Sequence, residues 1–145
     1  MGERGLRHRS LEPGTDILRF ERGDAVVDLL TSFARDHGIR AARLHGIGAF
    51  TDAELGFLDP DRREYDRFRI EEETEVLAFL GNLSVMEEGP RVHAHVTLGK
   101  RDGSAVGGHL FEGHVGATLE VFVLRFDAEL RRVQDEATGG ALLDL

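Results

Sequence analysis

Apolar and polar positions alternate over most of this chain and follow a helical period over one stretch only. The alternating residues 16–21 predict a strand. The helical stretch begins after Asp24, a residue type that caps helix N-termini, and ends at His37 and Gly38, a pair typical of a left-handed helix stop. Its apolar positions at helical spacing are Val26, Val27, Leu30, Phe33 and Ala34. We therefore predict one helix, placed early in the chain.

The remainder of the chain is typical of strands separated by turns. Apolar or alternating runs predict strands over residues 41–47, 53–58, 65–70, 75–86, 92–100, 105–111 and 117–127. Gly81 predicts a bulge or bend within its strand, and Asp102-Gly103 predicts a two-residue hairpin turn. From Ala128 onward we expect at most a short helix. One helix among about seven or eight strands predicts an α+β fold with a mainly antiparallel sheet.

We place no domain boundary inside the chain, because neither an internal repeat nor a linker-like composition interrupts it. Residues 1–15 are expected to form a flexible N-terminal segment, and residues 16–145 a single domain. No uncharged apolar stretch approaches the roughly 20 residues of a membrane span, and residues 1–11 lack the apolar core of a signal peptide. We therefore expect a soluble, cytoplasmic protein without membrane association.

Composition removes several function classes. The chain has no cysteine, which excludes disulfides, thiolate metal sites and cysteine nucleophiles. Its 18 Lys and Arg residues against 27 Asp and Glu give a formal net charge of −9, the wrong sign for a protein that coats a polyanion. Binding to DNA would thus be weak or would depend on a partner, unless Arg4, Arg7 and Arg9 form a local patch.

Three histidines carry the strongest chemical signal. His93 and His95 share one face of a strand, because side chains two residues apart point the same way. In a two-residue hairpin at Asp102-Gly103, His109 would face away from them, so we predict an extra, bulged residue at Gly107-Gly108. Three imidazoles would suit zinc, nickel, copper or iron and leave a position open. The alternative is that all three are half-exposed strand histidines without a ligand.

Other candidate residues carry weaker signals. Glu120 interrupts an apolar strand and is a candidate general base, or else it pairs with an arginine such as Arg125 or Arg91. For His45, between two apolar positions, we expect a buried, hydrogen-bonded imidazole. The remaining histidines are expected in solvated positions or at a strand edge: His8, His37 and His114.

Several short motifs, taken in order, resemble the PPC domain, the plant-and-prokaryote conserved domain. They are Arg22-Gly23-Asp24, His45-Gly46-Ile47-Gly48-Ala49, Glu54-Leu55-Gly56-Phe57, Glu75-Val76-Leu77, Gly81-Asn82-Leu83-Ser84, His93-Ala94-His95-Val96, Gly107-Gly108-His109-Leu110 and Thr118-Leu119-Glu120-Val121. The resemblance covers about Leu18 to Phe126. It implies a strongly bent antiparallel sheet packed on one helix, assembled as a homotrimer.

The same resemblance carries two functional expectations. Prokaryotic members are predicted DNA-binding proteins with a PD1-like motif, and some look like metal proteins that use the histidines matching His93, His95 and His109. The chain departs from the family pattern in lacking the Arg-Gly-Arg-Pro AT-hook and in carrying a histidine at position 45. We therefore expect a homotrimeric regulatory domain with a divalent metal, zinc first, on three histidines. The alternative is a small metal-dependent enzyme acting on an unknown small molecule, with Glu120 as its base.

Overall fold

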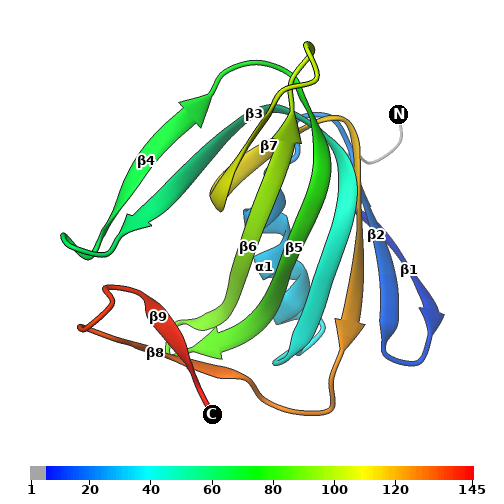
Figure 1. The fold of residues 1–145 in the computed structure, drawn as a ribbon. Coiled ribbons are helices and arrows are strands. Elements are labelled where there is room, and N and C mark those ends of the chain that lie inside the picture. The colour runs from blue at the N-terminus through cyan, green and yellow to red at the C-terminus, as the bar shows by residue number, and fades with distance from the viewer. Residues whose placement is uncertain (1–5) are drawn as a thin grey trace.

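The computed structural model describes residues 6–145 as one helix and nine strands (Figure 1). In chain order these are β1 (Arg7–Glu12), β2 (Thr15–Phe20), α1 (Val26–Asp36), β3 (Ala42–Asp59), β4 (Glu64–Ile70), β5 (Thr74–Met86), β6 (Gly89–Gly99), β7 (Ala105–Arg125), β8 (Arg131–Gln134) and β9 (Ala141–Asp144). The predicted α+β class with one principal helix is confirmed. No helix in the described range is long and apolar enough to cross a membrane.

The nine strands form one sheet in which all pairings except the single bridge between β5 and β8 are antiparallel. Its path runs β1-β2-β7-β3-β5-β8-β9, while β4 pairs with β3 and β6 pairs with both β5 and β7. β3 and β7 are each longer than expected, because each joins two ranges predicted as separate strands. Glycine does not interrupt them: a Cβ at Gly48 would lie 2.2 Å from the Thr118 carbonyl oxygen, so glycine there allows the two long strands to approach closely.

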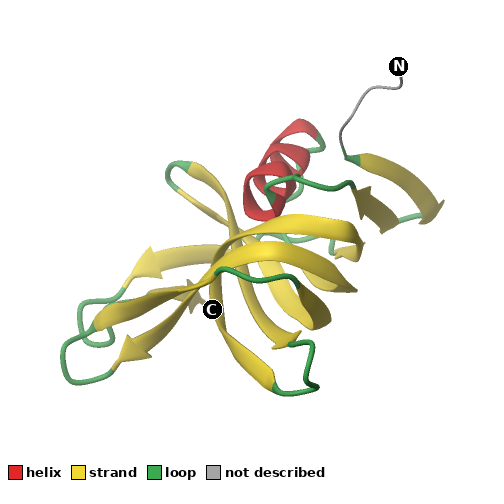
Figure 2. Ribbon diagram, turned by 90° about the horizontal axis from the view of Figure 1, so that it is seen from above, coloured by secondary structure: helices red, strands yellow, loops and turns green. Residues whose placement is uncertain are grey.

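The core lies between α1 and one face of the curved sheet (Figure 2). The helix buries Val26, Leu30, Phe33 and Ala34 against it, as the helical spacing predicted. It ends where predicted, with Gly38 in the left-handed region at φ 61°.

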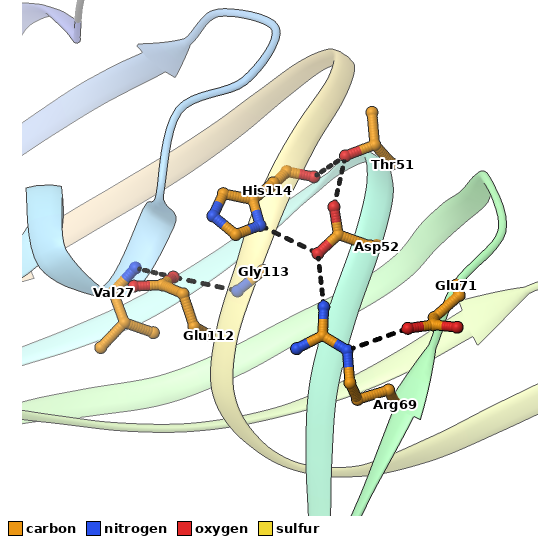
Figure 3. Close-up of polar contacts among 8 residues, drawn as sticks. All are labelled: Val27, Thr51, Asp52, Arg69, Glu71, Glu112, Gly113 and His114. Atoms are coloured by element: carbon orange, nitrogen blue, oxygen red, sulfur yellow. Dashed lines mark hydrogen bonds and ion pairs between the residues drawn. The ribbon is translucent and has the colours of Figure 1, made fainter.

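The start of α1 is capped by a residue far away in the sequence. The N-cap is Ala25, which has no capping side chain, and Asp24 instead accepts a hydrogen bond from the backbone N–H of Glu21 at 2.8 Å. The predicted capping role of Asp24 is therefore wrong. The carboxylate of Glu112 on β7 accepts from the N–H group of Val27 at 2.7 Å (Figure 3). It also accepts from the N–H group of Asp28 at 3.1 Å. A strand thus supplies the cap and joins the helix start to the sheet.

Both chain ends differ from expectation. Residues 1–5 of the predicted flexible segment lie outside the described residues, but β1 pairs with β2 through a turn in which Gly14 has φ 84°. The tail was expected to hold at most a short helix, and it forms the β8–β9 hairpin instead. The Asp135 side chain accepts from the Thr138 N–H in the connecting turn, where Gly139 has φ 81°, so local turn chemistry reverses the chain.

Candidate metal centre

Three histidines from two neighbouring strands gather on one face of the sheet. His93 and His95 lie on β6, and His109 on β7 lies directly opposite His95 in the ladder. The ring centres of His93 are 5.1 Å from His95 and 5.3 Å from His109, and those of His95 and His109 are 5.6 Å apart. One nitrogen from each ring lies within 4.8 Å of the other two. The predicted grouping of these three residues is therefore present.

The predicted route to this grouping is wrong. The β6–β7 pairing runs from His95–His109 to Gly99–Ala105 without a bulge at Gly107-Gly108. A three-residue loop closes the hairpin: the Lys100 N–H donates to the Ser104 carbonyl, the Gly103 N–H donates to the Lys100 carbonyl, and Gly103 has φ 83°. This is the usual geometry of a type I turn followed by a left-handed glycine. The loop itself supplies the extra residue that brings His109 to the histidine face.

The two adjacent glycines before His109 have another use. A Cβ at Gly107 would lie 2.7 Å from the Val96 carbonyl oxygen, and one at Gly108 would lie 2.8 Å from the Gly56 carbonyl oxygen. Both contacts are with backbone atoms, which cannot rotate away. Glycine at these positions therefore permits β7 to lie close to β6 and β3 at the same time.

Partial burial keeps two of the histidines neutral. Desolvation lowers the pKa of His93 from 6.5 to about 4, and nearby Arg132, His95 and Arg91 act in the same direction. Desolvation likewise lowers the pKa of His109 to about 4, assisted by His93 and His95. Both imidazoles are thus uncharged at neutral pH, which is the form that binds metal ions.

The donor set fits a divalent transition metal. Three neutral imidazoles are typical zinc ligands, and three protein ligands leave a coordination position free. Nδ1 of His109 is buried and has no hydrogen-bond partner among the described residues. The ring of His109 is held between Tyr65 and Phe111, whose centres lie 4.8 and 4.9 Å away. A buried ring nitrogen without a partner is costly, so the site favours a ligand there.

Arg132 is the site residue that sequence analysis missed. It lies on β8, and its Nη2 is 3.1 Å from Nδ1 of His93. Arginine has only donors, so the guanidinium donates and His93 accepts at Nδ1, which places the ring proton on Nε2. Metal binding through either nitrogen breaks this hydrogen bond: Nδ1 would need its lone pair, and Nε2 would need to pass its proton to Nδ1. Arg132 and an ion therefore compete for His93.

The histidines open into a pocket of about 320 Å³. The C-terminal hairpin forms one wall, below the β3–β4 hairpin in Figure 1. Its polar lining includes Tyr65, Arg91 and Arg132 beside the three histidines, and its apolar lining includes Leu58 and Leu142. An ion on the histidines would face this space, which is large enough for a small molecule.

Glu120 is not part of this site. It lies on β7 opposite Ile47 of β3, whereas His109 on the same strand lies opposite Gly56. Its side chain is exposed. Among the described residues it forms no ion pair with any arginine, including the expected candidates Arg125 and Arg91. Alternation places it on the outer face of the sheet, as it does the three histidines, but Glu120 does not line their pocket and lacks the burial on which its candidate role rested.

The interpretation of His45 also needs correction. The residue is half-buried, its Nδ1 has no hydrogen-bond partner among residues 6–145, and its ring stacks on Phe122 at 5.0 Å. It lies opposite Leu80 on the outer face of the sheet. The expected hydrogen-bonded core imidazole is therefore not observed.

His114 belongs to a separate polar network at the bend of β3 and β7 (Figure 3). Its Nδ1 lies 2.9 Å from Asp52, whose carboxylate also accepts from Thr51 and contacts Arg69. Burial would raise the pKa of Asp52, but the hydrogen bonds from His114 and Thr51 lower it below its ordinary value. The Thr51 hydroxyl donates to Asp52 and not to the imidazole, so this is no nucleophile–base pair. His8 and His37 are exposed, as expected.

Solved structures with the same fold cover nearly the whole chain. The metal-containing protein AF0104 from Archaeoglobus fulgidus is 35% identical over 100% of both chains, with a TM-score of 0.85. A plant- and prokaryote-conserved (PPC) protein from Pyrococcus horikoshii is 26% identical over 100% of this chain and 98% of its own, with a TM-score of 0.84. A "putative DNA binding protein" from Bacteroides thetaiotaomicron is 27% identical over 96% of both chains, with a TM-score of 0.91.

A search of curated proteins gave no match. The Plants and Prokaryotes Conserved (PCC) domain, in contrast, matches residues 12–127, which include the helix, the three histidines and both long strands. This range agrees with the stretch over which the sequence motifs resemble that family. The chain belongs to the Plants and Prokaryotes Conserved domain family.

Proposed function

We propose that this protein binds one divalent transition-metal ion per chain, zinc first, through His93, His95 and His109. The observation that carries the proposal is the convergence of three ring nitrogens within 4.8 Å on two paired strands. The lowered pKa values of His93 and His109 support it, because neutral imidazoles need not lose a proton to bind. The similarity to a metal-containing archaeal protein is consistent with it.

We further propose that the protein assembles as a homotrimer through the outer face of the sheet. Three large apolar side chains on β3 and β5 are more than half exposed in the single chain: Ile47 at 60%, Leu77 at 55% and Leu80 at 54%. Single exposed apolar residues are ordinary, but a group on one face marks a contact surface. His45 and Phe122 lie beside Leu80 on this face, and a neighbouring chain could offer the His45 Nδ1 a partner.

A second candidate function is metal-dependent chemistry on a small molecule, favoured by the pocket that adjoins the histidines. A divalent ion with an open position supplies Lewis acidity and lowers the pKa of bound water. None of the described pocket-lining residues is a carboxylate, so this candidate no longer includes Glu120 as its base. Tyr65 contacts His109 and is the hydroxyl-bearing side chain of the lining.

The metal proposal is tested by the zinc content of protein prepared without a histidine tag or chelator. We expect about one ion per chain in the wild type and almost none in His95→Ala. His37→Ala is the matched control, because His37 is an exposed histidine whose Nδ1 bonds the Phe33 carbonyl away from the site. Wild-type protein without metal, or a metal content that His95→Ala leaves unchanged, would overturn the proposal.

A further inference from the structure

Arg132 is a buried cation whose contacts are all neutral. Its exposed fraction is 8%. Nε donates to Ser84 Oγ at 3.0 Å, Nη1 to the Ala141 carbonyl at 2.7 Å, and Nη2 to Asn82 Oδ1 at 3.0 Å and to His93. A guanidinium has five N–H groups, so one N–H of Nη1 has no acceptor among the described residues.

Other arginines of the chain do pair with acidic side chains. Arg131, the preceding residue, pairs with Glu129 at 2.7 Å although its side chain is 44% exposed, and Arg125 pairs with the buried Asp16 at 2.7 Å. Arg132 forms no ion pair with any described residue, in a sequence with 27 acidic residues. A buried charge without a counter-charge is unfavourable.

The surrounding pocket has the same sign of charge. Arg91 and Arg132 both line it, and none of the described lining residues is Asp or Glu. The protein as a whole carries a net charge of −9, so this local excess of positive charge runs against its composition. A low-dielectric pocket lined by one sign of charge concentrates ions of the opposite sign.

We propose that this pocket binds a small anion through an oxyanion group, carboxylate or phosphate, that pairs with Arg132. The anion supplies the counter-charge that the chain does not, with Arg91 at the pocket wall as a second cation. Part of this inference rests on the proposed metal site: an ion on the histidines adds positive charge and releases Arg132 from His93, so the guanidinium gains a free N–H. The pocket volume of about 320 Å³ limits the ligand to a small molecule.

A purely structural role is the competing explanation for Arg132, because its bond to Ala141 ties β8 to β9. Such a role predicts that Arg132→Gln lowers stability without changing the response to anions. The two explanations therefore differ in a binding measurement. Arg131→Gln is the matched control, since it removes an arginine from the same strand that points away from the pocket and pairs with Glu129.

The test uses the full chain, with propionate and inorganic phosphate as probes and propionamide as the neutral analogue of propionate. Binding is followed by NMR chemical-shift titration in zinc-free and zinc-loaded protein, and zinc content is measured separately. We expect at least one of the two anions to bind wild type and Arg131→Gln with equal affinity. The same anion should bind Arg132→Gln at least tenfold more weakly. Propionamide should not bind any of the three proteins. The anion that binds more tightly identifies the class of the group.

Equal binding to wild type and Arg132→Gln, equal binding of propionamide and propionate, or no binding of either anion would overturn the proposal. If Arg132→Gln does not fold, Arg132→Lys, which keeps the charge, replaces it, and we expect it to retain anion binding with lower affinity. A protein that takes up no zinc but still binds the anion through Arg132 would refute the metal site and leave the anion site standing. A zinc-loaded protein that binds neither anion would refute the anion site and leave the metal site standing.

Discussion

His95 and His109 lie directly opposite each other in the β6–β7 ladder, and their ring centres are 5.6 Å apart. Directly opposed residues of an antiparallel pair point to the same face of the sheet. His93 joins them because it lies two residues from His95 on the same strand. The geometry of the site thus follows from the register of one hairpin, and a shift of one residue would turn His109 to the other face.

Gly103 in the hairpin loop should be important for stability. Its φ of 83° is disfavoured for β-branched residues, and no atom lies within 4 Å of a Cβ built there, so strain of the backbone is the whole effect. We expect Gly103→Val to lose roughly 1–2 kcal/mol of unfolding free energy in urea. Gly103→Asn, which tolerates this conformation, should lose much less. Equal losses in both variants would contradict the assigned loop geometry.

The metal-free protein should contain two histidines that titrate far below the ordinary range. With pKa values of about 4, His93 and His109 stay neutral at pH values well below 6.5. NMR titration of the imidazole ring protons in chelator-treated protein measures this directly. Midpoints near 6.5 for His93 and His109 would show that the site is more hydrated than its burial indicates.

The same pKa values set the direction of the pH dependence of stability. The folded-state pKa of both histidines lies below the unfolded value of 6.5, so the unfolded chain binds more protons between pH 6.5 and about 4. Their contribution to the free energy of unfolding is therefore fully present above pH 6.5 and is lost as the pH falls towards 4. Replacing both residues with Gln should flatten this part of the curve, measured by urea unfolding at a series of pH values.

The sequence was sufficient for the local features of the fold. Periodicity located α1 because Val26, Leu30, Phe33 and Ala34 all face the core, and alternation located most strands. It also grouped the three histidines, since the positions of His93 and His95 require only the two-residue repeat of a strand. The length of the hairpin loop was not predictable in the same way, because Asp-Gly suits both two- and three-residue loops.

Sequence patterns could not predict the contacts between segments that are distant in the chain. The helix cap is Glu112, 85 residues from Val27, and Arg132 reaches a histidine 39 residues away. Nothing in the residues around either side chain marks its partner. Their roles arise when the sheet bends, which brings β7 to the start of α1 and the C-terminal hairpin to the start of β6. The two strands of the tail span only four residues each, which is too short for an alternating pattern to predict them.

Removing the carboxylate of Glu112 should weaken the start of α1. Its two oxygens accept three backbone N–H groups, from Val27, Asp28 and Gly113. We expect Glu112→Ala to lose roughly 1–2 kcal/mol of unfolding free energy, the range of a lost helix cap. Glu112→Gln keeps one acceptor oxygen and should lose less. Hydrogen exchange of the Val27 and Asp28 amides would locate the effect, and unchanged exchange in Glu112→Ala would argue against a capping role.

Duplex DNA of generic sequence should bind weakly at physiological salt. Of the three arginines proposed as a basic patch, Arg7 forms an ion pair with Glu21 at 3.3 Å, Arg9 is exposed, and Arg4 lies outside the described residues. The net charge of −9 per chain opposes approach to a polyanion. We expect no binding below micromolar concentration in a gel-shift experiment without a partner protein. Submicromolar binding would indicate that Arg4, Arg7 and Arg9 form a basic patch that contacts DNA.

The outer face of the sheet should control assembly. We expect Leu80→Asp to convert the proposed homotrimer to a monomer, because a carboxylate would be desolvated at a subunit contact lined by Ile47, Leu77 and Phe122. Light scattering at micromolar concentration measures the mass. Phe57→Asp is the control, since Phe57 is 65% exposed on the projecting β3–β4 hairpin, and it should leave the trimer intact. A wild-type protein of monomer mass, or a trimer that survives Leu80→Asp, would exclude this face as the interface.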